Sequence, residues 1–221
     1  MNRKIITTSD GSKTIQIEEL NEQYHSIHGA VQEAKHVFIK NGLNLFRDQE
    51  ISILEIGFGT GLNALITLMC SKSSNLKVNY TGIEAYPVSK NELDQLNYIT
   101  CLKAEDLAEE FSKMHESRWE SNIVLTEEFI LTKRQQNFLN IEDVNAFDLI
   151  YFDAFGARVQ PELWTEILFE KMYRAMKTKA VLVTYSAKGS VRRAMRAVGF
   201  SVEKLPGPPG KREMLRATKL A

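Results

Sequence analysis

The sequence of 221 residues lacks any apolar run of about 18 residues, the length that would cross a membrane as a helix. It has two cysteines, Cys70 and Cys101, whose spacing fits neither a disulfide framework nor a metal site. Its first ten residues are too polar for a secretory leader. We therefore expect a protein of the reduced cytoplasm that neither enters a membrane nor binds a metal.

The chain also lacks a net charge, but its charges are unevenly distributed. Residues 1–153 carry a balance of −9, and residues 154–221 carry a balance of +9. A basic C-terminal third on a neutral protein is typical of one surface that faces a polyanion such as RNA. The alternative is that these basic side chains only keep the surface solvated.

A glycine-rich turn follows the first strongly apolar strand. Gly57, Gly59 and Gly61 lead from this strand into a helix that begins at Leu62. Glycine at such a turn allows backbone angles closed to other residues and lets a ligand approach the main chain. A dinucleotide-binding turn would have a small residue where Leu62 stands. With Glu55 just before it, the turn instead favours an S-adenosylmethionine-dependent methyltransferase over an ordinary tight turn.

Strands and helices alternate along the rest of the chain. Strands are predicted near residues 51–56, 77–84, 129–134, 146–153, 180–185, 200–205 and 213–218. Helices are predicted near residues 29–40, 62–69, 88–97, 101–114, 161–176 and 190–198. This order predicts an α/β protein with a Rossmann-like, seven-stranded, mainly parallel sheet whose last strand is antiparallel, as in S-adenosylmethionine-dependent methyltransferases. Residues 1–45 are predicted to be an extension that packs on a methyltransferase domain of residues 46–221.

Two acidic residues stand where strands of such a sheet end. Glu84 closes the second strand, where an acid accepts hydrogen bonds from the ribose hydroxyls of a bound nucleoside. Asp153 closes the fourth, at the mouth of the sheet, where a carboxylate can orient an amine or take its proton. The alternatives are an exposed strand-end carboxylate for Glu84 and a turn cap for Asp153.

Four motifs carry a resemblance to a known family. They are Gly-Phe-Gly-Thr-Gly-Leu-Asn at 57–63, Asp-Ala-Phe-Gly-Ala-Arg at 153–158, Thr-Tyr-Ser-Ala at 184–187 and Gly-Lys-Arg-Glu-Met-Leu at 210–215. Together they resemble the methyltransferase domain of the MnmC family, over about residues 24–217. The resemblance implies methylation of the primary amine of 5-aminomethyl-(2-thio)uridine at the tRNA wobble position, giving 5-methylaminomethyl-(2-thio)uridine, with S-adenosylmethionine as cofactor.

Residue roles follow for this chain. We assign Asp153 to catalysis. The residues assigned to the cofactor are Glu55, Gly57, Gly59, Gly61, Asn63, Glu84 and Asn137. The residues assigned to the tRNA substrate are Tyr24, Ser26, Phe155, Lys188, Arg192, Arg193, Lys211 and Arg212. The family's oxidoreductase half has no counterpart here, so we expect a standalone methyltransferase that relies on a separate oxidoreductase or another source of the aminomethyl group.

Two other functions compete with this interpretation. An aminopropyltransferase also combines an acidic strand end with a nucleoside-sulfonium pocket, but the basic C-terminal third argues against a polyamine substrate. A non-catalytic RNA-binding protein of the same fold would have no need of Glu84 and Asp153 together. Binding of the cofactor would distinguish the enzymes from the non-catalytic RNA-binding protein. Transfer of a methyl group to tRNA would distinguish a methyltransferase from an aminopropyltransferase.

Overall fold

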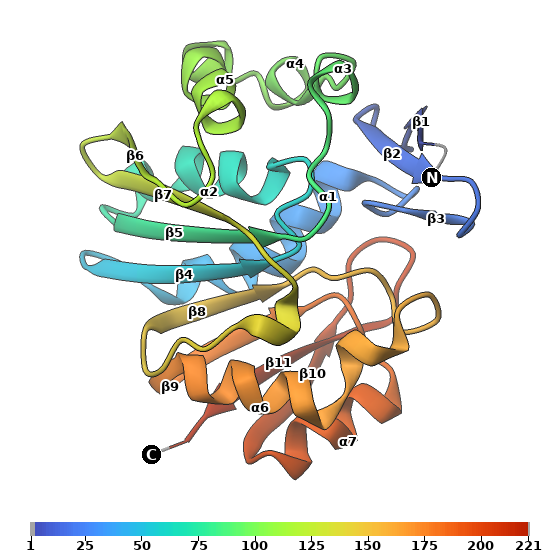
Figure 1. The fold of residues 1–221 in the computed structure, drawn as a ribbon, viewed down its shortest axis with the longest axis vertical. Coiled ribbons are helices and arrows are strands. Elements are labelled where there is room, and N and C mark those ends of the chain that lie inside the picture. The colour runs from blue at the N-terminus through green and yellow to red at the C-terminus, as the bar shows by residue number, and fades with distance from the viewer. Residues whose placement is uncertain (1–2, 221) are drawn as a thin grey trace.

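One large sheet forms the centre of the computed structural model, which describes residues 3–220. Its strands are β4 (Glu50–Ile56), β5 (Lys77–Glu84), β6 (Asn122–Thr126), β7 (Phe129–Gln135), β8 (Phe147–Phe152), β9 (Met176–Thr184), β10 (Phe200–Pro206) and β11 (Glu213–Lys219). They lie in the order β10-β11-β9-β8-β4-β5-β7-β6 (Figure 1). The strands β7, β5, β4, β8 and β9 are parallel, and β11 is antiparallel to both of its neighbours. The predicted fold class is therefore confirmed, including its antiparallel last strand.

The sheet has eight strands rather than the predicted seven. The additional strand is β6, which forms a hairpin with β7 at one edge. The sequence gives little signal there, because β6 has one neighbour and Val124 in its middle is 57% exposed. Only Leu125 of this strand is buried, so its hydrophobic pattern is too weak to predict it.

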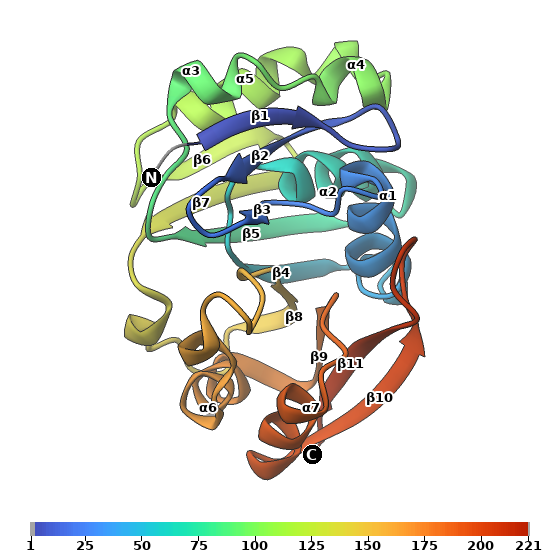
Figure 2. The ribbon, with the colours of Figure 1, turned by 90° about the vertical axis from the view of Figure 1, so that its right-hand side faces the viewer.

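Helices cover both faces of the sheet (Figure 2). The α-helices are α1 (Ala30–Ala34), α2 (Leu62–Ser73), α3 (Lys90–Leu93), α4 (Tyr98–Leu102), α5 (Ala108–Glu116), α6 (Glu166–Ala175) and α7 (Gly189–Ala197). The shorter or irregular helices are η1 (Lys35–Lys40), η2 (Leu43–Leu45), η3 (Glu105–Leu107), η4 (Phe138–Asn140) and η5 (Pro161–Trp164). Successive strand residues point to opposite faces, so Ile53 belongs to the core under α1 and α2 and Leu54 to the core under α6 and α7.

Four of the predicted helices are shortened or divided in the structure. Residues 88–114 form α3, α4, η3 and α5, because Lys103 adopts a left-handed backbone conformation and the Asn97 side chain bonds to the N-terminal segment. Residues 29–40 form α1 and the π-helical η1. The helix predicted from Pro161 begins as the 3-10 turn η5 before α6. No helix among the described residues has the length and apolarity needed to cross a membrane.

The first residues of the chain form a second, small sheet. Its antiparallel strands are β1 (Arg3–Thr7), β2 (Lys13–Ile17) and β3 (Glu22–Gln23), which the sequence did not predict because each has at most five residues. This sheet lies beside the ends of β4 and β5 (Figure 1), and Ile17 lines a pocket together with Gly57. The predicted domain boundary at residue 45 stays a prediction.

Candidate active site

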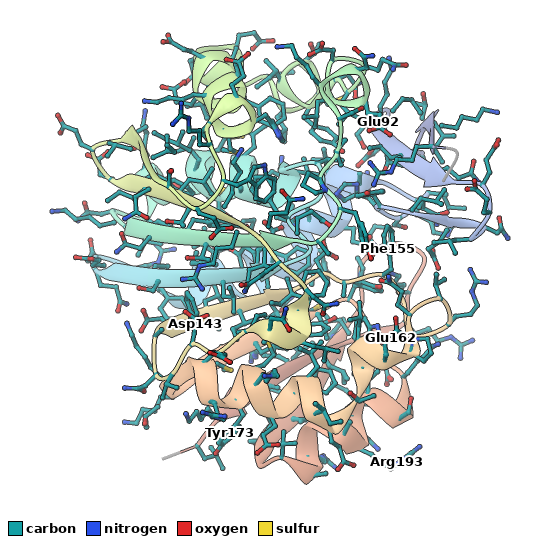
Figure 3. All side chains as sticks on the ribbon, viewed as in Figure 1. Glu92, Asp143, Phe155, Glu162, Tyr173 and Arg193 are labelled. Carbon is teal, nitrogen blue, oxygen red and sulfur yellow. The ribbon has the colours of Figure 1, made fainter. Side chains whose placement is uncertain are left out.

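A pocket opens at the carboxyl ends of β4, β5 and β8. Ligands bind at this edge in open α/β sheets, because the loops that follow parallel strands gather there. The predicted site residues that line it are Tyr24, Gly57, Gly59, Asn63, Glu84, Asn137, Asp153 and Phe155. Phe155 and Glu162 lie on the same side of the molecule, below the N-terminal strands (Figure 3).

The glycine turn brings backbone against backbone at the floor of the pocket. Gly57 has φ +89°, and a Cβ there would lie 2.7 Å from the carbonyl oxygen of Asp153. Gly59 has φ +50° and faces the ring of Tyr24. A side chain at either position would be strained and would push apart the segments that form the pocket.

Glu84 is positioned by two backbone amides. Its Oε2 accepts a hydrogen bond from the N–H of Gly59 at 3.0 Å, and its Oε1 accepts one from Tyr86 at 2.9 Å. The carboxylate therefore joins the end of β5 to the glycine turn. Each carboxylate oxygen has a further lone pair, so Glu84 can still accept a hydrogen bond from a ligand.

A chain of buried polar groups leads from the core to Asp153. The Asn63 Nδ2 group donates to Asp153 Oδ2 and to Glu55 Oε1, both at 2.8 Å, and the Tyr80 hydroxyl donates to Glu55 Oε2 at 2.8 Å. Glu55 is completely buried and does not line the pocket, so it supports Asn63 from below. Asn63 Oδ1 is buried, and no described residue donates to it.

The environment of Asp153 favours its protonated form. Burial raises the pKa of Asp153 to about 7, and the nearby Glu33 carboxylate adds to this, while the hydrogen bond from Asn63 and the charge of Lys211 oppose it. A carboxyl group with a pKa near neutrality can take up and release a proton under physiological conditions. This property cannot be read from the position of Asp153 in the sequence.

Aromatic side chains close one wall of the pocket. The rings of Tyr24 and Phe155 meet edge to face with their centroids 5.0 Å apart. The indole N–H of Trp164 donates to the Phe155 carbonyl at 2.8 Å, which fixes the segment after β8. This wall joins the N-terminal segment to the Asp153 loop and offers a face on which a planar base can stack.

The pocket fits a nucleoside that carries an ammonium group. Glu84 and the unpartnered Asn63 Oδ1 provide acceptor oxygens for hydroxyl and ammonium hydrogens. Phe138 and Leu139 offer apolar surface beside Asn137. Asn137 Oδ1 already accepts a hydrogen bond from the N–H of Leu139, which leaves one lone pair for a ligand.

Several predicted residues lie outside the pocket. Gly61 faces His115 and Phe58 at the start of α2. Ser26 forms a local turn, in which its N–H donates to Glu33 and its hydroxyl accepts from the N–H of His28. Neither residue lines the pocket, and their direct contacts with cofactor and tRNA stay predictions.

The predicted basic residues fall into two groups. Lys188, Arg193 and Arg212 are exposed, and Arg193 lies on the same side of the molecule as Phe155 (Figure 3). Arg192 is half-buried, and Lys211 forms an ion pair with Glu33. The first group is exposed to an approaching polyanion, and the RNA contacts of all five residues stay predictions.

Two residues near Asp153 were not assigned to the site from the sequence. Glu33 is a buried acid on α1, between Gln32 and Ala34, and an acid within the helical stretch of residues 29–40 is the signal that could have identified it. Tyr185 follows β9, and its hydroxyl donates to the Ala154 carbonyl at 2.8 Å. Both carboxylates, of Asp153 and of Glu33, contribute to raising the pKa of Tyr185 well above its usual range, after the main effect of burial.

Comparisons with known proteins agree with this geometry. A family model described as S-adenosyl-L-methionine-dependent methyltransferase matches residues 103–220. The tRNA 5-methylaminomethyl-2-thiouridine biosynthesis bifunctional protein MnmC of Aromatoleum aromaticum is 32% identical over 209 residues, which cover 87% of this chain and 32% of that protein. The chain spans about a third of the length of such curated relatives.

Solved structures extend the comparison. The crystal structure of MnmC2 from Aquifex aeolicus superposes with a TM-score of 0.79 at 26% identity, covering all of this chain and 70% of that one. These matches confirm the predicted resemblance to the methyltransferase domain of MnmC. A spermidine synthase complex superposes with a TM-score of 0.62 at 15% identity, covering 98% of this chain and 70% of that one, which shows a shared fold alone.

Proposed function

The chain belongs to the family of S-adenosyl-L-methionine-dependent methyltransferases, and we propose that it methylates the primary amine of 5-aminomethyl-(2-thio)uridine at the wobble position of tRNA. The product is 5-methylaminomethyl-(2-thio)uridine. The observation that carries this proposal is the Asp153 carboxyl group, whose pKa is raised to about 7 where the glycine turn meets the aromatic wall. The name of the MnmC relatives supports the same acceptor.

The cofactor-binding half of the pocket is built from β4 and β5. When bound, S-adenosylmethionine supplies an electrophilic methyl group on a sulfonium centre. We assign Glu84 to the ribose hydroxyls, Asn63 Oδ1 to the ammonium group, and the backbone at Gly57 and Gly59 to the approach of the methionine part. Asn137 and Phe138 hold the adenine side.

In the acceptor half of the pocket, the substrate amine loses a proton. A primary alkyl amine is mostly ammonium at neutral pH and attacks a methyl group only after it loses a proton. Asp153 orients the amine and takes up that proton, and its raised pKa makes it a far better base than an exposed carboxylate. Tyr24 and Phe155 stack on the uracil ring and exclude water from the reacting atoms.

The tRNA approaches the side of the molecule on which the pocket opens. Exposed Lys188, Arg193 and Arg212 contact phosphates there, and they fix the position of the RNA without reading its sequence. We propose that a separate oxidoreductase or an equivalent source supplies the aminomethyl group of the substrate.

The test is methyl transfer from radiolabelled S-adenosylmethionine to tRNA from cells that accumulate the 5-aminomethyl nucleoside. We expect label in 5-methylaminomethyluridine and none in tRNA from cells that cannot make the aminomethyl group. Calorimetric binding of S-adenosylhomocysteine serves as the control for a folded pocket. Cofactor binding without transfer to the aminomethyl tRNA would contradict the proposal, and transfer to a free polyamine instead would favour the aminopropyltransferase-like class of substrate.

A further inference from the structure

An ammonium group already occupies a position beside Asp153. The Lys211 ammonium pairs with the Glu33 carboxylate and lies 3.9 Å from the centroid of the Tyr185 ring. A carboxylate together with the face of an aromatic ring is a favourable site for an ammonium group. Tyr185 in turn bonds to the carbonyl of Ala154, next to Asp153 in the chain.

The loop that carries Lys211 is attached to the N-terminal segment at three points. Besides the Lys211–Glu33 pair, His36 Nε2 lies 2.8 Å from the carbonyl oxygen of Pro206, and the imidazole of His28 packs directly on the backbone of Gly210. The ion pair is the only one of these three contacts that places charges near Asp153. The contacts of His36 and His28 therefore serve as controls, because they attach the loop without placing a charge near Asp153.

The charges of the ion pair act on Asp153 in opposite directions. Glu33 raises the proton affinity of Asp153, and Lys211 lowers it. Glu55 and Tyr185 also lie close enough to interact with Asp153 electrostatically. Lys211 is thus an ammonium that interacts with two carboxyl groups, those of Glu33 and Asp153, and without it both acids would lose this positive charge.

We propose that Lys211 and the substrate amine exchange places. In the free protein, Lys211 pairs with Glu33. In the RNA complex, Lys211 moves to a phosphate, and the aminomethyl ammonium takes the former position of Lys211 between Glu33, Tyr185 and Asp153. This inference rests on the proposed function and deepens it. The number of charges near Asp153 stays the same through the exchange. Glu33 is then a positioning residue that selects RNA carrying the amine, and Lys211 contacts phosphate only once that amine is bound.

The experiment measures affinity for two anticodon stem-loop RNAs, one with 5-aminomethyluridine and one with uridine at the wobble position. S-adenosylhomocysteine is present so that no turnover occurs. The quantity compared is the preference, which is the Kd for the uridine RNA divided by the Kd for the aminomethyl RNA. The variants are Glu33→Gln, Lys211→Met, the double variant, and His36→Phe as the matched control that removes an uncharged contact of the same loop.

We expect Glu33→Gln to reduce the preference by about tenfold, the effect of one charge pair in a half-buried setting. Lys211→Met leaves the affinity for the uridine RNA unchanged and raises the preference, since no internal ammonium competes with the substrate amine for Glu33. His36→Phe leaves the preference at the wild-type value. The double variant removes both charges and shows the reduced preference even if Glu33→Gln alone does not fold with Lys211 unpaired.

An unchanged preference in Glu33→Gln, or an equal reduction in His36→Phe, would overturn the exchange and leave the ion pair a structural contact. A reduction in Lys211→Met as large as in Glu33→Gln would also overturn it. These outcomes differ from failure of the proposed function, in which the wild-type protein binds the two RNAs equally and transfers no methyl group.

Discussion

At the scale of single residues, Asp153 combines two opposing properties. Its half-buried carboxyl group is useful as a base because its pKa lies near 7, and for the same reason its ionised form destabilises the fold. The site therefore gives up folding stability to place a basic carboxylate where an amine will bind.

The first prediction concerns stability. The pKa of Asp153 is higher in the folded protein than its usual 3.8, so the folded state binds a proton more tightly and the unfolding free energy falls as pH rises from about 4 to about 7. We expect Asp153→Asn to be more stable than the wild type by about 2 kcal/mol at pH 8. Chemical denaturation at pH 8 and at pH 4 checks this, and the difference disappears at pH 4. A less stable variant at pH 8 would show that the ionised carboxylate is well solvated.

The second prediction concerns turnover by the same variant. Asparagine keeps the shape of the side chain but cannot accept a proton, so we expect S-adenosylhomocysteine to bind normally and kcat to fall about 100-fold or more. In the wild type, kcat/KM rises with pH through about 7 as Asp153 ionises. Single-turnover rates between pH 5.5 and 9 measure both effects. Near-normal turnover in the folded variant would rule out an essential role for this carboxylate.

The third prediction separates hydrogen bonding from charge at Glu55. This buried side chain accepts hydrogen bonds from Asn63 and Tyr80, and burial raises its pKa well above the usual range. We expect Glu55→Ala to lose about 2 to 4 kcal/mol, because two buried donors lose their acceptor. Glu55→Gln keeps one acceptor oxygen and loses clearly less. Urea unfolding measures the unfolding free energy of both variants. Equal losses of stability would show that the negative charge itself is required.

At the scale of elements, the turn between β4 and α2 sets the geometry of the pocket. Gly57 combines a positive φ with close contact to the end of β8. We expect Gly57→Ala to lose about 2 kcal/mol of stability and most cofactor affinity, through backbone strain and displacement of the Asp153 segment. Gly156→Ala is the matched control, because a Cβ there has its nearest neighbour at 3.6 Å. Thermal melting and calorimetry measure both variants, and equal behaviour would show that the turn tolerates a side chain.

How deeply each element is buried determines how well the sequence could predict it. Strands such as β4 and β8 are covered on both faces, so they appear as apolar runs that end in Gly57 and Asp153. The edge strand β6 and the N-terminal strand β1 bury too little to leave such a pattern, and β2, which buries Ile15 and Ile17, is only five residues long. Glu33 and Lys211 are separated by 178 positions, and no local spacing reveals that they meet. The pKa of Asp153 likewise depends on groups from other elements.

Across the whole molecule, the positive charges that we assign to RNA binding lie in the C-terminal third of the chain, whereas most residues assigned to the cofactor and to catalysis lie before it. The basic third of the chain provides exposed cations, such as Arg193 and Arg212. Phosphate contacts of this kind give affinity that falls steeply with salt concentration.

The fifth prediction uses that dependence. Neutralising Arg193 and Arg212 together is expected to weaken tRNA binding and to reduce the slope of log Kd against log salt concentration by about two. Binding of S-adenosylhomocysteine is unaffected. Lys72, exposed at the far end of α2, provides the control substitution. An unchanged salt slope in the double variant would place the RNA on another surface.

The most direct test of the account is the identity of the methylated nucleoside. Wild-type protein and Asp153→Asn are each incubated with S-adenosylmethionine and tRNA that carries 5-aminomethyluridine, and the digested nucleosides are analysed by mass spectrometry. We predict that the wild type converts this nucleoside to 5-methylaminomethyluridine with the new methyl group on the side-chain nitrogen, and that the variant converts about a hundredth as much in the same time or less. A methyl group on a ring atom or ribose, or equal conversion by the variant, would contradict the account.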